Sequence, residues 1–197
     1  MTGFASLRPG RENILMMKNF KPSKEDLRDA VNRTTEDLID HDLKVLFCGI
    51  NPGIWSGATG FHFAKPGNRF WKVLHLAGFT DRQLHPSEEY ELLERGYGIT
   101  SFCKRTTARA DELSTEEFIE GGRLLVKKLE KYKPRMLAVL GITAYRTAFQ
   151  QPKAKLGLQS EKIAGTKVWL LPNPSGLNAH YQAGDLAALF RELREAV

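Results

Sequence analysis

The chain has 197 residues, of which 42% are hydrophobic and 26% are charged. It is therefore long enough for one globular domain with a packed core, and too apolar to be disordered or fibrous. The 29 Lys and Arg exceed the 23 Asp and Glu by +6, which fits a polyanionic partner without requiring one, and the two cysteines are too few for a four-cysteine zinc site or an iron–sulfur cluster.

The first 41 residues are expected to form an amino-terminal arm, followed by a single domain over residues 42–197. Residues 1 to about 21 show no sustained hydrophobic period, which is typical of a flexible or loosely docked segment. Ser23, with acidic residues close behind it, is a plausible start for a short helix. The chain lacks a run of ~20 apolar residues and a secretory leader, so we expect no membrane span and a cytoplasmic location.

Within the domain, short apolar runs alternate with stretches of helical period. Because parallel strands need crossover connections, this order predicts an α/β fold of three αβα layers, with a short and mainly parallel central sheet. Ser114 and Glu117 form a capping-box pattern at the start of the longest helix. The predicted strands are residues 44–48, 97–101, 136–140 and 168–171, and the predicted helices are residues 68–78, 114–133, 142–149 and 185–195.

Two of these strands end in similar loops. The first leads into Gly49-Ile50-Asn51-Pro52-Gly53, and the last into Pro172-Asn173-Pro174-Ser175-Gly176-Leu177. If the strands are parallel, both loops open at the carboxyl edge of the sheet, where α/β proteins usually bind ligands. The glycines permit a sharp turn and the close approach of a ligand, so Asn51 is presented into a cleft.

Four motifs stand out in chain order: GINPG at residues 49–53, TGFHF at 59–63, NRFWK at 68–72 and NPSGL at 173–177. Together they resemble the mismatch-specific uracil-DNA glycosylase and thymine-DNA glycosylase family, within the uracil-DNA glycosylase superfamily. The resemblance implies a monofunctional hydrolase of base-excision repair that flips a base out of duplex DNA and cleaves its N-glycosidic bond. Uracil in a G:U mismatch is the expected target, with thymine, ethenocytosine and other damaged pyrimidines as further candidates.

By this resemblance, Asn51 holds the water that attacks the sugar. An amide is a poor base, so its role would be positioning more than proton abstraction. Phe63 would stack on the flipped base, which is worth ~1–3 kcal/mol. Ile50, Gly53 and Ser56 would complete the base pocket, with backbone groups of Ile50 and Phe63 bonding the edge of the base.

The last motif corresponds to a loop that enters the minor groove. Leu177 would be the wedge that fills the hole left by the flipped nucleotide. Pro174, Ser175 and Gly176 would shape this loop, and backbone groups near Gly176 would read the opposite guanine. Some relatives carry arginine two residues after the leucine, where this chain has Ala179. Reading of the guanine is therefore weakened, or rerouted through Asn178 or His180.

Other departures limit the expected chemistry. The more active uracil-DNA glycosylases have aspartate in the first loop and histidine in the last, where this chain has Asn51 and Asn173. Ser101 stands where some relatives have lysine, so no catalytic lysine is assigned. We expect no metal or cofactor, and a monomer that associates with the nucleoid through double-stranded DNA. The candidate phosphate contacts are Lys65, Arg69, Lys72, Lys104, Arg105, Arg109 and His180.

Two other functions stay open on the sequence alone. A catalytically weak or silent lesion-binding protein on the same fold would carry the same motifs, because a site based on asparagine has little catalytic power to lose. An unrelated α/β enzyme could use the glycine turn to bind a phosphate. That turn lacks the G-x-G-x-x-G and G-K-[ST] patterns, which makes the last reading the weakest.

Overall fold

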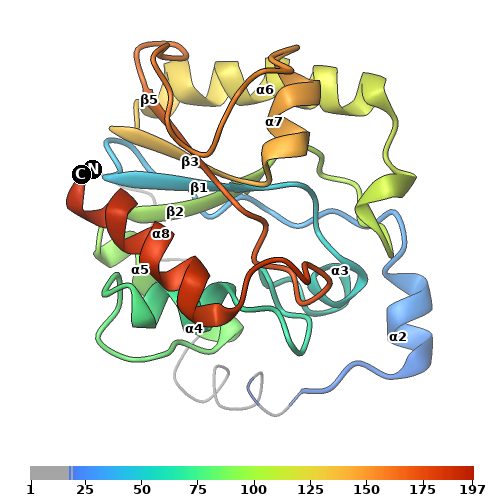
Figure 1. Cartoon of the computed structure of the whole chain (residues 1–197). Helices are drawn as coiled ribbons and strands as arrows, with labels where there is room; N and C mark the ends of the chain where they lie inside the picture. Colours follow the sequence, from blue (N-terminus) through green and yellow to red (C-terminus); the bar gives the residue numbers. More distant parts are fainter. Residues whose placement is uncertain (1–17, 19) are drawn as a thin grey trace.

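A five-stranded sheet lies between two layers of helices in the computed structural model, which describes residue 18 and residues 20–197 (Figure 1). The strand order is β2-β1-β3-β5-β4, in which β4 alone is antiparallel to its neighbour. The predicted three-layer α/β architecture is thus confirmed. The strands are β1 (Val45–Gly49), β2 (Tyr97–Ser101), β3 (Met136–Leu140), β4 (Gly157–Leu158) and β5 (Lys167–Leu171).

The helices cover both faces of the sheet (Figure 1). One face carries α6 (Thr115–Tyr132) and α7 (Ile142–Ala148). The other carries α4 (Phe70–Leu76), α5 (Glu91–Glu94) and α8 (Ala183–Glu195). Two further helices pack on each other, α2 (Lys24–Asp29) and α3 (Ile54–Thr59), and two 3₁₀ turns span Pro86–Glu88 and Ala110–Glu112.

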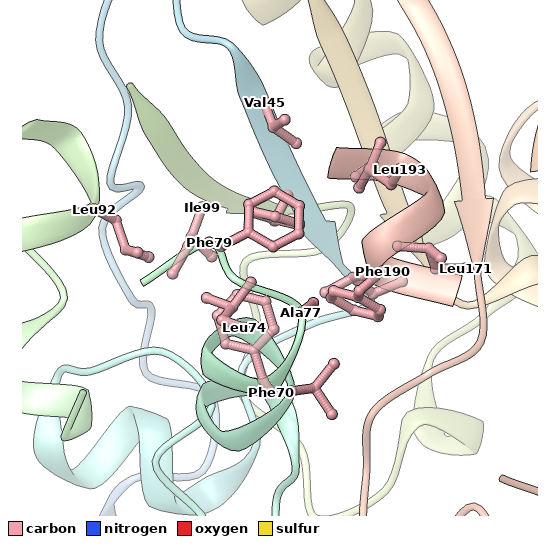
Figure 2. Close-up of a cluster of buried hydrophobic side chains, with 14 of the residues drawn as sticks. Val45, Phe70, Leu74, Ala77, Phe79, Leu92, Ile99, Leu171, Phe190 and Leu193 are labelled. Atoms are coloured by element: carbon pink, nitrogen blue, oxygen red, sulfur yellow. The ribbon is translucent and has the colours of Figure 1, made fainter. Parts of the chain in front are cut away.

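The central strands β1 and β3 are buried along their whole length, as strands of a parallel sheet between two helix layers are expected to be. Along β1, Val45 and Phe47 belong to the core beneath α4 and α8, while Leu46 and Cys48 belong to the core beneath α6 and α7. Figure 2 shows part of the first core, in which Phe70 and Phe190 reach the sheet from α4 and α8. A continuous apolar run is therefore the expected sequence of such a strand.

Helix ends follow the expected chemistry. Ser114 caps α6 with its side chain, and the helix ends at Lys133 in the left-handed conformation, with a φ of 49°. The helix predicted after Asn68 begins at Phe70, whose N–H donates to Asn68 Oδ1 at 3.0 Å. Arg69 therefore occupies the N-cap position, which corrects the prediction that Asn68 caps this helix, although the Asn68 side chain still accepts from the first helical N–H.

The last residues of the predicted arm pack on the outer edge of β2. Leu38 is buried and forms a bridge with Ile99, and Thr34 forms one with Arg105. The predicted flexible segment at residues 1 to about 21 falls mostly outside the described residues. Of the helices described, none has the length and apolar character needed to cross a membrane.

Candidate active site

A cavity of about 770 Å³ opens at the carboxyl ends of the parallel strands, bordered by the loops that follow β1 and β5. Asn51, Phe63 and Leu177 all line it, although they come from three separate motifs. Pro174 and Gly176 lie in the second loop without lining the cavity. The other predicted residues that line it are Ile50, Gly53, Ser56, Lys65, Arg109, Ser175 and Asn178.

Asn51 is held by its amide nitrogen. Nδ2 shares its two hydrogens among three acceptors: the carbonyl oxygens of Pro52 at 3.1 Å and Arg105 at 2.9 Å, and Thr107 Oγ1 at 2.8 Å. The Thr107 hydroxyl is fixed in turn, because it donates to the carbonyl of Arg109 at 2.7 Å. Within the described chain, Oδ1 of Asn51 takes no recorded hydrogen bond, so it is the atom left to accept one from a water or a ligand.

Phe63 forms an aromatic wall of the cavity. Its ring stacks on Phe70 with centroids 4.0 Å apart and an interplanar angle of 27°. Its backbone is left-handed, with a φ of 53°, which is uncommon for a residue with a side chain. Gly49 makes room for the ring, since a Cβ there would lie 3.3 Å from Phe63 Cζ. The backbone N–H groups of Ile50 and Phe63 have no recorded partner in the described chain and are free to bind a ligand.

Helix α3 forms another wall. Ser56 is 5% exposed, and its Oγ accepts a 3.4 Å hydrogen bond from the Ala64 N–H. Gly57 lets the helix approach the segment after β2, because a Cβ at Gly57 would come within 2.7 Å of Thr106 Oγ1. The wall that carries Ser56 therefore packs closely on the Thr106 side chain and the Ala30 carbonyl.

His62 lines the cavity and was not among the predicted site residues. It is 8% exposed, and Glu89, itself 4% exposed, lies beside it. Glu89 Oε2 accepts from the His62 backbone N–H at 2.8 Å and lies 3.0 Å from Nδ1. The Trp71 indole N–H donates to the His62 carbonyl at 3.1 Å. Glu89 thus fixes the orientation of the imidazole, and only the fold shows that the two residues meet.

The loop after β5 exposes Leu177 while its backbone is held by side chains. Leu177 is 74% exposed. Asn173 Oδ1 accepts from the Ser175 N–H at 2.9 Å, and Ser175 Oγ accepts from the Leu177 N–H at 3.3 Å. Asn178 Nδ2 donates back to the Asn173 carbonyl at 3.0 Å. A leucine presented to solvent on an ordered loop is the arrangement that insertion into a partner requires.

Residues 36–197 match the sequence model of the Uracil DNA glycosylase superfamily. The chain belongs to this superfamily. A protein from Methanosarcina acetivorans, solved by solution NMR and provisionally described as a uracil DNA glycosylase, has a similar structure with a TM-score of 0.57. The two sequences are 19% identical, and the match covers 83% of this chain and 99% of that chain, so the likeness shows the shared fold. Superfamily membership implies DNA glycosylase activity, a hydrolysis of N-glycosyl bonds.

In this superfamily member, two of the predicted phosphate contacts are engaged elsewhere. Arg69 donates through its guanidinium to carbonyls of the loop after β5. Arg105 forms a bidentate pair with Glu117, at 2.8 Å and 3.0 Å. Hydrogen bonds from Arg105 and from the Ser114 N–H lower the pKa of the Glu117 carboxyl to about 2. The guanidinium donors of Arg69 and Arg105 are thus engaged within the protein, and the role of these two residues as phosphate contacts stays a prediction.

The remaining candidates are exposed cations. Arg109 pairs with Asp111 on the surface, and Lys104 lies 3.8 Å from Asp37. Exposed pairs of this kind are weak and can exchange partners. For Lys65, Lys72 and His180, no ion pair is recorded within the described residues, and of these three Lys65 alone lines the cavity.

The cysteines are not placed for nucleophilic chemistry in this glycosylase-superfamily fold. Burial raises the pKa of the Cys103 thiol to about 11, and burial also raises that of Cys48. Ser101 donates its hydroxyl to the Cys103 carbonyl at 2.9 Å. Over residue 18 and residues 20–197, no group of three or more His, Cys, Asp or Glu is placed to hold a metal ion.

Proposed function

We propose that the chain is a monofunctional, mismatch-specific uracil DNA glycosylase related to thymine DNA glycosylases, acting on uracil opposite guanine in double-stranded DNA. The observation that carries the proposal is the fixed amide of Asn51. Its N–H donors are bound inside the protein, which leaves Oδ1 for a water. The same cavity is lined by an aromatic ring, Phe63, and by an exposed apolar side chain, Leu177.

The chemistry proposed for the site is hydrolysis of the C1′–N1 bond. The bond breaks with its electron pair going to N1 of uracil, and the oxygen of the water held by Asn51 bonds to C1′. The water loses its proton to solvent, because an amide is not a base. N–H groups of Ile50 and Phe63 would stabilise the negative charge on the leaving base. The rate would then depend on bases that leave as stable anions.

Base flipping is proposed to use the two loops together. Phe63, backed by Phe70, would stack on the extruded base, and Leu177 would fill the gap left in the duplex. Backbone groups at Gly176 and the side chain of Asn178 would face the guanine, in place of the arginine of some relatives. Thymine and ethenocytosine remain further candidate substrates, and the wall formed by Ser56 would decide how large a base fits.

A single-turnover assay tests the proposal. The wild-type protein is mixed in excess with a duplex that carries one G·U pair, and abasic sites are counted. Matched G·T and A·U duplexes measure acceptance of thymine and dependence on the opposite guanine. We expect Asn51→Ala to lower the cleavage rate by about 100-fold or more without changing DNA affinity, since only the water is lost.

The alternative function has a distinct outcome in the same assay. Wild-type protein that binds the G·U duplex and yields no abasic sites would be a lesion-binding protein on this fold. Equal cleavage by wild type and Asn51→Ala would instead mean that the protein is a glycosylase whose reaction does not depend on Asn51.

A further inference from the structure

We propose that Arg69 is a positioning residue, which holds the loop of residues 173–181 in the conformation that presents Leu177. This role rests on the proposed function above. The guanidinium donates to four carbonyls of the loop: those of Pro174 at 3.3 Å, Asn178 at 2.9 Å, Ser175 and Tyr181. The backbone N–H of Arg69 also donates to the Pro174 carbonyl, at 3.0 Å.

The chemistry of the contact explains why an arginine occupies this position. The loop is neither strand nor helix, so its carbonyls need donors from elsewhere. A planar guanidinium offers several N–H donors in fixed directions, whereas the ammonium of lysine is a compact charge whose three N–H donors rotate about one nitrogen. No carboxylate among the described residues pairs with Arg69 in a salt bridge, so its charge is balanced by these carbonyl dipoles. The loop is therefore wrapped around the guanidinium.

A second contact fixes the loop at its tip. A Cβ at Gly176 would lie only 2.8 Å from the carbonyl oxygen of Gly67, so the two backbones touch. Gly67 precedes Arg69, and Phe70 follows it and stacks on Phe63. The segment before α4 thus touches the loop that carries Leu177 at two places, through the Gly67 carbonyl and through the Arg69 guanidinium.

The first test compares two arginines that hold loops. Arg69→Met removes the guanidinium at the site. Arg146→Met is the matched control, because Arg146 donates to the Ala154 carbonyl at 3.1 Å and 2.6 Å on α7, outside the cavity. We expect Arg69→Met to lower the single-turnover rate on a G·U duplex by about tenfold or more, and Arg146→Met to change it by less than about twofold.

A double-mutant cycle separates positioning from general loss of structure. If Arg69 acts through Leu177, adding Arg69→Met to Leu177→Ala should lower the rate little further. Effects that multiply in full would overturn the inference. Arg69→Lys keeps the positive charge but loses the planar set of N–H donors. We therefore expect this variant to retain affinity for DNA without restoring the single-turnover rate of wild type.

Limited proteolysis reports on the loop without any DNA. Chymotrypsin should cut after Leu177 or Tyr181 about tenfold faster in Arg69→Met than in wild type or Arg146→Met, since local opening governs such cleavage. A wild-type protein without glycosylase activity would refute the proposed function, while this readout would still test the contact. Equal cutting of all three proteins would refute the role of Arg69.

Discussion

At the scale of single residues, two adjacent threonines differ in what their hydroxyls do. Both are buried, at 0% exposure for Thr106 and 1% for Thr107. Thr107 Oγ1 accepts from Asn51 and donates to the Arg109 carbonyl. Thr106 Oγ1 is buried without a hydrogen-bond partner in the described structure. One hydroxyl therefore orients the proposed water-holding amide, and its neighbour only fills space beside α3.

Replacing each threonine by the isosteric valine separates these roles. We expect Thr107→Val to lower the single-turnover rate by about tenfold to 100-fold, because Asn51 loses one of its three acceptors and moves. Thr106→Val should leave the rate unchanged and should not reduce the free energy of unfolding, because an unpaired buried hydroxyl is removed. Rates and urea unfolding curves of both variants check this pair. Equal rates for the two valine variants would contradict the role of Thr107.

Leu177→Ala tests the wedge. Because the side chain is 74% exposed, its removal should leave the melting temperature unchanged. Flipping should slow and the abasic product should dissociate faster, since nothing fills the gap in the duplex. Stopped-flow fluorescence of 2-aminopurine beside the uracil measures the first, and a competition assay with trapped product measures the second. An unaltered dissociation rate would count against the wedge.

Some site residues were accessible from the sequence and others were not. Asn51 and Leu177 belong to motifs that follow parallel strands, so their meeting at one edge of the sheet could be anticipated, whereas Phe63 follows α3 and was assigned to the site by its motif alone. Arg69 and His62 sit inside such motifs too, but their meaning depends on remote partners. The carbonyls that accept from Arg69 lie more than 100 positions later in the sequence. From the sequence alone, an arginine beside a proposed DNA site is interpreted as a phosphate contact, because the carbonyls that accept its hydrogen bonds are not visible in the sequence.

At the scale of elements, hydrophobic periodicity and capping residues predicted the four parallel strands, the long helices and the short helix α2 capped by Ser23, but not α3 or β4. Three of the four parallel strands are apolar runs, and the predicted bounds of all four agree with the structure to within about a residue. Helix α3 escaped prediction because Ile54–Thr59 begins after a glycine, includes another, and shows no helical period. Strand β4 has only two residues, Gly157–Leu158, and exists because β5 offers it an edge.

The turn Pro86–Glu88 between α4 and α5 depends on a buried carboxylate. Glu88 is 8% exposed, and it pairs with Arg82 at 2.9 Å and Lys18 at 2.7 Å. Burial alone would raise the pKa of this carboxyl. Hydrogen bonds from Arg82, Lys18 and the His85 N–H outweigh it and lower the pKa to about 2 from 4.5.

A lowered pKa in the folded state makes the contribution of Glu88 depend on pH. Its stabilisation is fully present above the unfolded pKa near 4.5 and is lost as the pH falls toward 2. We expect Glu88→Gln to reduce the free energy of unfolding by about 2 kcal/mol at pH 6, and the difference from wild type to shrink below pH 4.5. Urea unfolding from pH 6 to pH 3 measures it, with Glu130→Gln on the exposed side of α6 as the control. A difference that does not depend on pH would contradict the ionic role.

At the scale of the whole molecule, the chain has a net charge of +6, but some of the basic side chains near the site already have partners within the protein. Arg105 is paired with Glu117, and Arg69 is enclosed by its loop. Lys65 is exposed at the cavity, with no ion pair recorded within the described chain. Of the predicted phosphate contacts that line the cavity, Lys65 is thus the one without a recorded ion pair among the described residues, while Arg109 pairs with Asp111.

Salt dependence measures those contacts directly. A plot of log affinity for a G·U duplex against log salt should be linear, with a slope near −0.9 for each phosphate neutralised. We expect Lys65→Met to reduce the steepness of this slope by about 1, and Lys153→Met, near β4, to leave it unchanged. Fluorescence anisotropy over a range of salt gives both slopes. Equal slopes of log affinity against log salt for wild type and Lys65→Met would show that Lys65 does not contact a phosphate.

The contact between Gly67 and Gly176 constrains how the proposed active site can be remodelled. Neither backbone can accept a side chain at position 176 without moving, because a Cβ there would meet the Gly67 carbonyl oxygen at 2.8 Å. A chimera that imports the wedge loop of a relative, with any larger residue at 176, must therefore import the matching segment before α4 as well. Two stretches that are remote in the sequence behave as one exchangeable part, so a change of specificity in this fold has to be made in both at once.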